Sequence, residues 1–132
     1  MSNSAMVRNI YLGYIDGKVE AILACLHEDI NWASEAACGT APWHGVHRGK
    51  SEVREFFARL RGALEVTDFS PISLAEHGDE VHCVVQFGFQ VRANGQSGTM
   101  QLHHWWRFRE GKVYHYRGTE DTELLARLLS AR

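Results

Sequence analysis

The sequence predicts an α+β fold: a strongly curved antiparallel sheet, shaped like a cone, packs on about three α-helices, and a short helix follows at the C-terminus. Apolar residues recur mostly at helical spacing up to residue 64, then alternate with a period of two as far as residue 117. Helical spacing returns in the last ten residues or so. Helices gathered before a run of strands are typical of α+β domains.

The length and composition exclude several classes of protein. The chain has 132 residues, the size of one domain, and we expect residues 1–132 to fold as a single unit. A formal net charge of −2 does not favour nucleic acid as a partner. No apolar run is long enough to span a membrane, and the N-terminus lacks the pattern of a signal peptide. We therefore expect a cytoplasmic protein without a membrane partner.

Cysteine and histidine spacing gives no sign of a metal. The three cysteines, Cys25, Cys38 and Cys83, are an odd number without Cys-x-x-Cys spacing, so reduced thiols are the simplest interpretation. The histidines lack a His-x-His or HExxH arrangement, and the neighbours His103 and His104 would point to opposite faces of a strand. We expect no metal site and no organic cofactor.

The first half of the chain is expected to be mainly helical. Residues 4–16 carry one apolar stripe, Gly17 interrupts it, and a second helical stripe runs from residue 19 to residue 26. The sequence INWAS, residues 30–34, predicts a short strand with Trp32 and Ser34 on one side. Residues 36–49 contain glycine and proline and predict a long loop, a kind of segment that is often functional.

The second half is expected to form a meander of about four strands. Ser51 is expected to cap a helix that ends near Leu64, and a weakly patterned strand follows at 65–76. Alternation is clear at 81–91, at 100–108 and at 113–117. The pairs Asn94-Gly95 and Glu110-Gly111 predict the turns between these strands. Residues 121–130 then predict the terminal helix.

These two turns predict a register. With Glu110-Gly111 as a two-residue turn, Phe108 faces Val113, Trp106 faces His115 and His104 faces Arg117. With Asn94-Gly95 as the other turn, the expected rows are Val81–Phe108, Cys83–Trp106, Val85–His104, Phe87–Leu102 and Phe89–Met100. The inner face would then hold His104, Trp106, His115 and Arg117. A slip of one residue would reverse these faces.

Each ionisable residue of this face has an ordinary structural interpretation as well. Histidines on an apolar face are usually core residues with satisfied hydrogen bonds. A buried guanidinium is costly without a partner, so Arg117 must reach a carboxylate, a ligand or water. Asp121 is placed either to cap the final helix or to act as a general base at the rim of the cone.

The opposite face of the sheet carries a second group of rings. His103 and Trp105 would lie beside Tyr114 and Tyr116 on the outside of the sheet. Large aromatic patches of this kind mark interfaces. We therefore expect a homodimer joined through this face.

Three stretches in order, YLGYIDGKVEAILACLHEDINW, GVHRGKSEVREFFARL and WWRFREGKVYHYRGTED, resemble the SnoaL-like branch of the nuclear transport factor 2-like superfamily. The resemblance covers nearly the whole chain. It implies a curved antiparallel sheet with about three helices around a conical pocket, usually in a dimer. Relatives include polyketide cyclases, ketosteroid isomerases, limonene epoxide hydrolases, dehydratases and binding proteins without chemistry.

The resemblance also suggests which chemistry fits. The polyketide cyclases use an acid near the end of the last strand, where Asp121 stands here. The isomerases carry a carboxylate on the first strand, where Trp32 and Ser34 stand here, and Ser34 cannot replace it. The epoxide hydrolases need Arg-x-Asp where this chain has Val85 and Phe87. These departures argue against the last two chemistries.

Two functional hypotheses follow, and a third is less favoured. In the first, the protein is an enzyme for a carbonyl-containing polycyclic or aromatic substrate: Asp121 takes a proton, His104 assists, and Arg117 or a histidine stabilises the enolate. The expected pocket walls are Tyr14, Trp32, Ser34, Trp43, Phe56, Phe87, Trp106 and His115. In the second, the same pocket holds a small apolar ligand without catalysis. The third, an association domain, is disfavoured because no second domain is visible.

Overall fold

Residues 1–37, 39 and 41–132 are described by the computed structural model, and within them the chain forms four helices and six strands. Cys38, one of the cysteines expected to be reduced, lies outside the described residues; Cys25 and Cys83 are free thiols. The elements are α1 (Asn3–Ile15), α2 (Val19–Leu23), β1 (Leu26–Ser34), β2 (Gly45–Arg48), α3 (Gly49–Ala63), β3 (Leu64–His77), β4 (Glu80–Val91), β5 (Ser97–Arg109), β6 (Lys112–Thr119) and α4 (Thr122–Ser130).

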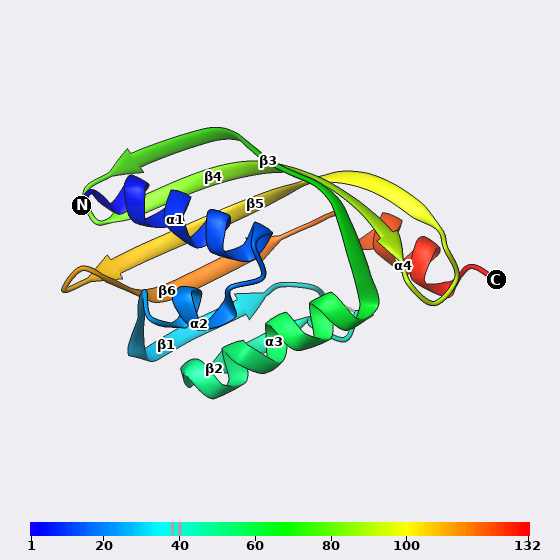
Figure 1. The fold of residues 1–132 in the computed structure, drawn as a ribbon, viewed down its shortest axis with the longest axis horizontal. Helices are drawn as coiled ribbons and strands as arrows, with labels where there is room; N and C mark the ends of the chain where they lie inside the picture. The colour runs from blue at the N-terminus through cyan, green and yellow to red at the C-terminus, as the bar shows by residue number, and fades with distance from the viewer. Residues whose placement is uncertain (38, 40) are drawn as a thin grey trace.

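The strands form one curved, open sheet in the order β2-β1-β6-β5-β4-β3, which confirms the predicted α+β class. Every neighbouring pair is antiparallel except β1 and β6, which run parallel. Because a parallel pair needs a long crossover, everything from β2 to β5 lies between these two strands in the sequence. Figure 1 shows the bent sheet with α1, α2 and α3 on one side, and with α4 at the end where the C-terminus lies.

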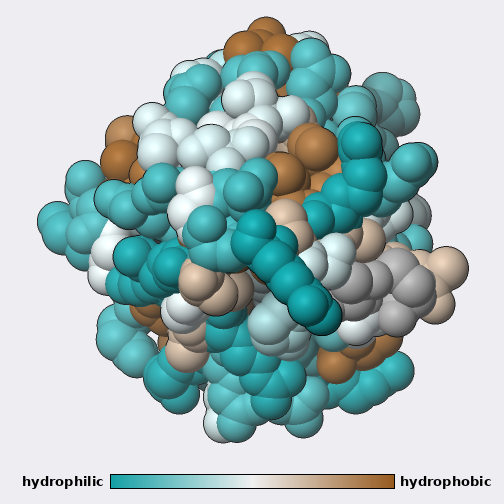
Figure 2. Space-filling model, turned by 90° about the vertical axis from the view of Figure 1, so that its right-hand side faces the viewer, coloured by the Kyte–Doolittle hydropathy of each residue, from teal (hydrophilic) through white to brown (hydrophobic). Residues whose placement is uncertain are grey.

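The helices cover the sheet because each buries an apolar stripe. Val7, Ile10 and Tyr11 form the buried side of α1, and Phe56 and Phe57 lie on the buried side of α3. These residues join the inner side chains of the strands in one hydrophobic core. Figure 2 looks at the end that carries α4, where hydrophilic side chains dominate and apolar ones form small separate groups. None of the described helices is long and apolar enough to cross a membrane.

The predicted rows between β4 and β5 are wrong by two positions. Cys83 pairs with His104 and Val85 pairs with Leu102, whereas we expected Trp106 and His104 opposite them. The reason is the turn: Gln90 pairs with Ser97, so a longer connection that ends on Gly95 replaces the two-residue turn. A shift of two keeps each side chain on its expected face, because the side-chain period of a strand is two.

The rows between β5 and β6 change faces. Glu110 and Gly111 both have positive φ, as a tight primed turn requires, and Phe108 faces Val113 as predicted. The next row, however, pairs Arg107 with His115, so Tyr114 is an extra residue in β6. This β-bulge shifts the register by one and reverses the faces beyond it.

Because of the bulge, the predicted faces of three residues are wrong. Tyr116, expected on the outer face, pairs with Trp106 on the inner face and is buried. His115 and Arg117, expected inside, share the outer rows of Arg107 and Trp105.

The remaining differences are local. Leu26 begins β1 instead of ending the second helix, and β2 occupies part of the expected loop. Helix α3 begins at Gly49, so Ser51 lies inside the helix and is not its cap.

Candidate functional site

The concave side of the sheet and the helices enclose a hollow of about 60 Å³ that opens to solvent. One water needs roughly 10–15 Å³, so the enclosed part holds only a few waters or the edge of one ring. A larger ligand must extend into the mouth or displace side chains. Eight predicted site residues line this hollow: Tyr14, Trp32, Ser34, Trp43, Phe56, Phe87, His104 and Trp106.

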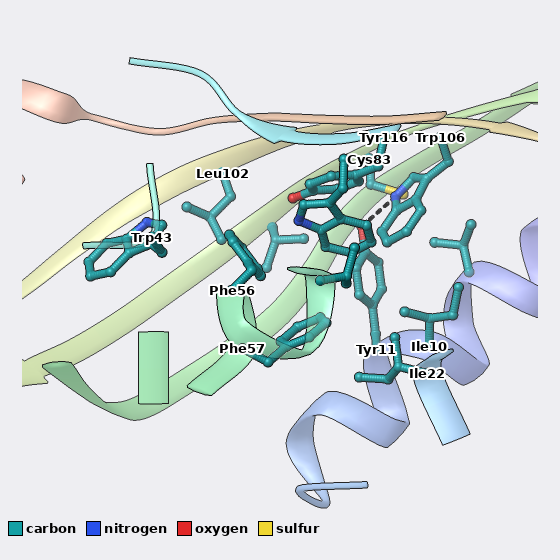
Figure 3. Packing of buried hydrophobic residues seen from close by; sticks show 14 of the residues in the cluster. Ile10, Tyr11, Ile22, Trp43, Phe56, Phe57, Cys83, Leu102, Trp106 and Tyr116 are labelled. Carbon is teal, nitrogen blue, oxygen red and sulfur yellow. Dashed lines mark hydrogen bonds between the residues drawn. The ribbon is translucent and has the colours of Figure 1, made fainter. Parts of the chain in front are cut away.

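Aromatic rings make the walls rigid. Trp32 stacks on Tyr116 with the ring centroids 3.9 Å apart, and Phe56, Phe57 and Trp106 meet Trp32 edge to face. Such contacts restrict ring rotation and leave flat apolar surfaces between them. Figure 3 shows these walls from within the core, with Tyr11, Trp106 and Tyr116 close together and Trp43 set apart beyond Leu102 and Phe56.

A hydrogen-bonded chain of three side chains forms the inner end of the hollow. Trp106 Nε1–H donates to the Tyr11 hydroxyl (3.2 Å), which lies 2.8 Å from His104 Nδ1. The Tyr11 oxygen accepts from the indole, and in the tautomer in which its hydroxyl donates to Nδ1 the ring proton of His104 is on Nε2. Burial lowers the pKa of His104 from 6.5 to about 3, and the neighbouring His103 adds to the effect. His104 is therefore a neutral donor at neutral pH.

A carboxylate stands at the other end of the hollow. Glu120 follows β6 directly, and its side chain is 10% exposed. Its Oε1 accepts from Trp43 Nε1–H at 2.9 Å and lies 2.6 Å from His44 Nε2. Both donors come from the connection between β1 and β2 and meet on one oxygen, so Oε2 has no hydrogen bond from the described residues.

The backbone fixes the proton position on His44. Ala41 N–H donates to His44 Nδ1 at 3.2 Å, so this nitrogen must be an acceptor and carry no proton. The ring proton is then on Nε2, where it donates to Glu120. The His44 side chain is 1% exposed, which keeps water from competing for this bond.

Two tyrosine hydroxyls lie near the same carboxylate. Burial raises the pKa of Tyr14 to about 12, an effect that Arg61 opposes and the charge of Glu120 reinforces. Burial likewise raises the pKa of Tyr116 well above its usual value, and Glu120 is the next largest cause. Both groups are therefore protonated hydroxyls able to donate hydrogen bonds inside the hollow.

Gly118 allows Tyr116 to lie where it does. Both residues point to the inner face of β6, and a Cβ on Gly118 would collide with the Tyr116 hydroxyl. The missing side chain makes room for the phenol ring to lie over the strand. Gly118, Tyr116 and Glu120 all line the hollow, so this packing lies within the site.

The predicted base, Asp121, does not line the hollow. Its side chain is exposed and accepts from Leu124 N–H at 3.0 Å, so Asp121 is the N-cap of α4, the ordinary alternative for this residue. The residue before it, Glu120, supplies the carboxylate instead. Side-chain alternation could have identified Glu120. Because the bulge in β6 shifts the alternation by one residue, Tyr116, Gly118 and Glu120 lie on the inner side.

The outer face holds the other two misplaced residues. Arg117 reaches a carboxylate there, because its Nε lies 3.2 Å from Glu35 Oε1. His115 Nδ1, Arg107 Nε and Asn31 Oδ1 are buried without a hydrogen bond among the described residues, and Arg107 Nε lies 3.5 Å from Glu80 Oε1 in an ion pair. They occupy one row across three strands, since His115 pairs with Asn31 on β1 and with Arg107 on β5.

The described residues contain no group of three His, Cys, Asp or Glu side chains arranged to hold a metal ion. The polar side chains that line the hollow include Glu120, His104 and the hydroxyls of Tyr14 and Tyr116.

The chain is similar to a family of known proteins in sequence and in structure. The model of the SnoaL-like domain matches residues 7–116. An NTF2-like protein of unknown function from Burkholderia pseudomallei is 26% identical, with a TM-score of 0.91, over 99% of this chain and 100% of that one. TerC, crystallised with polyporic acid, is 24% identical, with a TM-score of 0.84, over 96% and 97% of the two chains. A candidate polyketide cyclase from Xanthomonas campestris is 15% identical, with a TM-score of 0.79, over 96% and 95%. A comparison with curated protein sequences finds no match.

Proposed function

The chain belongs to the SnoaL-like domain family, and on this premise we propose that it is an enzyme that moves a proton next to a carbonyl group of a small, flat substrate. Fold alone does not fix chemistry, so the proposal depends on the site. The substrate is expected to be apolar and ring-shaped, because aromatic walls line the hollow.

The observation that carries the proposal is a carboxylate, Glu120, in a hollow whose lining, among the described residues, is mostly aromatic. Glu120 is held at Oε1 by Trp43 and His44, while Oε2 has no hydrogen bond from the residues that the structure describes. A carboxylate fixed at one oxygen presents the other in a defined direction, as a general base requires. His104 and the hydroxyls of Tyr14 and Tyr116 supply donors that stabilise an enolate oxygen.

The proposal is tested by hydrogen–deuterium exchange at the carbon beside a ketone. We expect the protein to speed exchange of 1-indanone in D₂O, followed by proton NMR. Glu120→Gln keeps an oxygen for Trp43 and His44 but removes the base, so the rate should fall by about 100-fold or more. Asp121→Asn is the matched control, because it makes the same change at the exposed helix cap and should keep the wild-type rate.

Binding is measured alongside by quenching of tryptophan fluorescence, since Trp32, Trp43 and Trp106 line the hollow. Polyporic acid, with which TerC was crystallised, is a second ligand to screen. If carbonyl ligands bind without any exchange above the buffer rate, or if Glu120→Gln exchanges at the wild-type rate, the enzymatic proposal is wrong. In the first case, the alternative of a non-catalytic binding protein is favoured.

We further propose a homodimer joined through the outer face of the sheet. Asn31 Oδ1 and His115 Nδ1 on this face are buried without a hydrogen-bond partner among the described residues, which favours groups from outside the protomer, because buried polar atoms normally have partners. Arg117 and Glu35 put opposite charges on the same face, and a two-fold interface needs such a self-complementary surface.

Light scattering after size exclusion tests this arrangement. Trp105→Glu should convert the dimer to monomers, because it places a charge on the outer face. Leu12→Glu is the control, since Leu12 is exposed on α1, on the other side of the sheet. A Trp105→Glu variant that stays dimeric would contradict the interface.

A further inference from the structure

We infer that Trp32 makes the hollow selective for a ligand carbonyl oxygen, because its indole N–H is a hydrogen-bond donor left free for that oxygen. The inference deepens the proposed function and requires only that the ligand occupies the hollow. It names a specificity-determining residue on β1, and it gives the ligand class as small ring ketones and related carbonyl compounds.

The first observation is an unsatisfied donor. Trp32 is 2% exposed, and its Nε1 is buried without a hydrogen-bond acceptor among the described residues. Burying an N–H group without an acceptor is unfavourable, and such groups are rare in folded proteins. Trp32 also lines the hollow, so a ligand there is placed to supply the missing acceptor.

The second observation is the contrast with the other tryptophans. The chain has four, and each of the remaining three donates its indole N–H to a named oxygen. Trp43 donates to Glu120, Trp105 to Glu80, and Trp106 to Tyr11. Within the part of the chain that the structure describes, Trp32 alone lacks such a partner.

The third observation is that Trp32 cannot turn to find an acceptor elsewhere. Its ring is stacked on Tyr116 and is held at its sides by the edges of Phe56, Phe57 and Trp106. Rotation of the indole would break all of these contacts at once. The direction of the N–H bond is therefore set before a ligand arrives, which lowers the entropy cost of binding.

Trp32 and Glu120 face the same hollow with complementary capacities. Trp32 offers a proton donor, and Glu120 Oε2 offers an acceptor. When Oε2 takes the proton from the carbon beside the carbonyl, the electron pair of the broken C–H bond forms the enolate, and the negative charge settles on the oxygen bonded to Trp32. Return of the proton to carbon regenerates the carboxylate, so no other reactant is needed.

The test compares two ligands of the same shape. 1-Indanone carries a carbonyl oxygen and indane does not, so the ratio of their dissociation constants measures recognition of that oxygen. NMR titration of the wild type and of Trp32→Phe gives the ratio for each protein. The preference for indanone should fall about 3- to 10-fold in Trp32→Phe, the value of one neutral hydrogen bond.

Trp105→Phe is the matched control. It makes the same change on the outer face of the sheet, where the Trp105 N–H is bonded to Glu80 and the ring does not line the hollow, so the preference for indanone should stay at the wild-type value. A preference unchanged in Trp32→Phe, or reduced equally in Trp105→Phe, would overturn the inference.

A second measurement does not depend on a variant that folds. In the wild-type protein labelled with ¹⁵N-tryptophan, the Trp32 indole proton should shift downfield with indanone and not with indane. Equal shifts with both ligands would overturn the inference. Neither experiment measures turnover, so the two proposals can fail separately. If the Glu120→Gln exchange test fails but the Trp32 results are as expected, the enzymatic proposal is rejected and the selectivity for a carbonyl oxygen is retained. The reverse combination rejects only the role of Trp32.

Discussion

Acid should destabilise this protein through His104. Burial lowers the pKa of His104 to about 3, whereas in the unfolded chain it returns to 6.5. Between these two values the unfolded chain binds a proton that the folded protein does not, so the free energy of unfolding falls as the pH falls through this window. Well above pH 6.5 His104 is neutral in both states and contributes no slope. At about 1.36 kcal/mol per pH unit, the loss between about pH 7 and about pH 4.5 amounts to about 2.5 kcal/mol.

Urea denaturation at these two pH values measures the effect. His104→Asn keeps a side-chain acceptor for the Tyr11 hydroxyl and removes the titrating ring. All other ionisable groups remain in both proteins, so their contribution cancels when the two pH dependences are subtracted. The wild type should lose about 2.5 kcal/mol more than His104→Asn on acidification. His77→Asn, at an exposed histidine, should behave like the wild type. Parallel losses in the wild type and His104→Asn would show that His104 is not held neutral by burial.

Two further substitutions follow from the site. Gly118→Ala should lower the free energy of unfolding by about 1–3 kcal/mol, because the new methyl group collides with the Tyr116 hydroxyl. Urea denaturation should show that most of this loss is recovered when Tyr116→Phe is added. A loss that stays the same in the double variant would contradict this contact. Asp121→Ala should lower the free energy of unfolding by about 0.5–2 kcal/mol, because it removes the cap of α4. Asp121→Asn should stay within a few tenths of a kcal/mol of the wild type in thermal unfolding. Equal losses in the two variants would argue against a capping role.

Periodicity predicted the elements well because they are long and bury one face. Helix α1 and strand β4 each carry an unbroken apolar pattern, and the structure places them close to the expected bounds. Strand β2 was missed because its four residues at the sheet edge, Gly45–Arg48, have only His47 buried and show no alternating apolar pattern.

The site was harder to predict, because its face assignment depends on one inserted residue. Tyr114, His115 and Tyr116 are all ring side chains, so their order gives no apolar pattern from which a bulge could be located. The two-residue turn predicted the first row of β5 and β6 correctly, and the bulge then exchanged the roles of His115 and Tyr116. The same shift of one residue decides which of two adjacent acids faces the hollow: Glu120 lines it, and Asp121 caps α4.

The parallel pairing of β1 with β6 has a consequence for biosynthesis. The bond from Trp43 to Glu120 joins positions 77 residues apart, and β1 has no neighbour on its β6 side until residues 112–119 have been made. Closing such long loops is entropically costly, so we expect β6 to dock late and to limit the rate of folding. A nascent chain would therefore expose the aromatic lining of the hollow until β6 has docked beside β1.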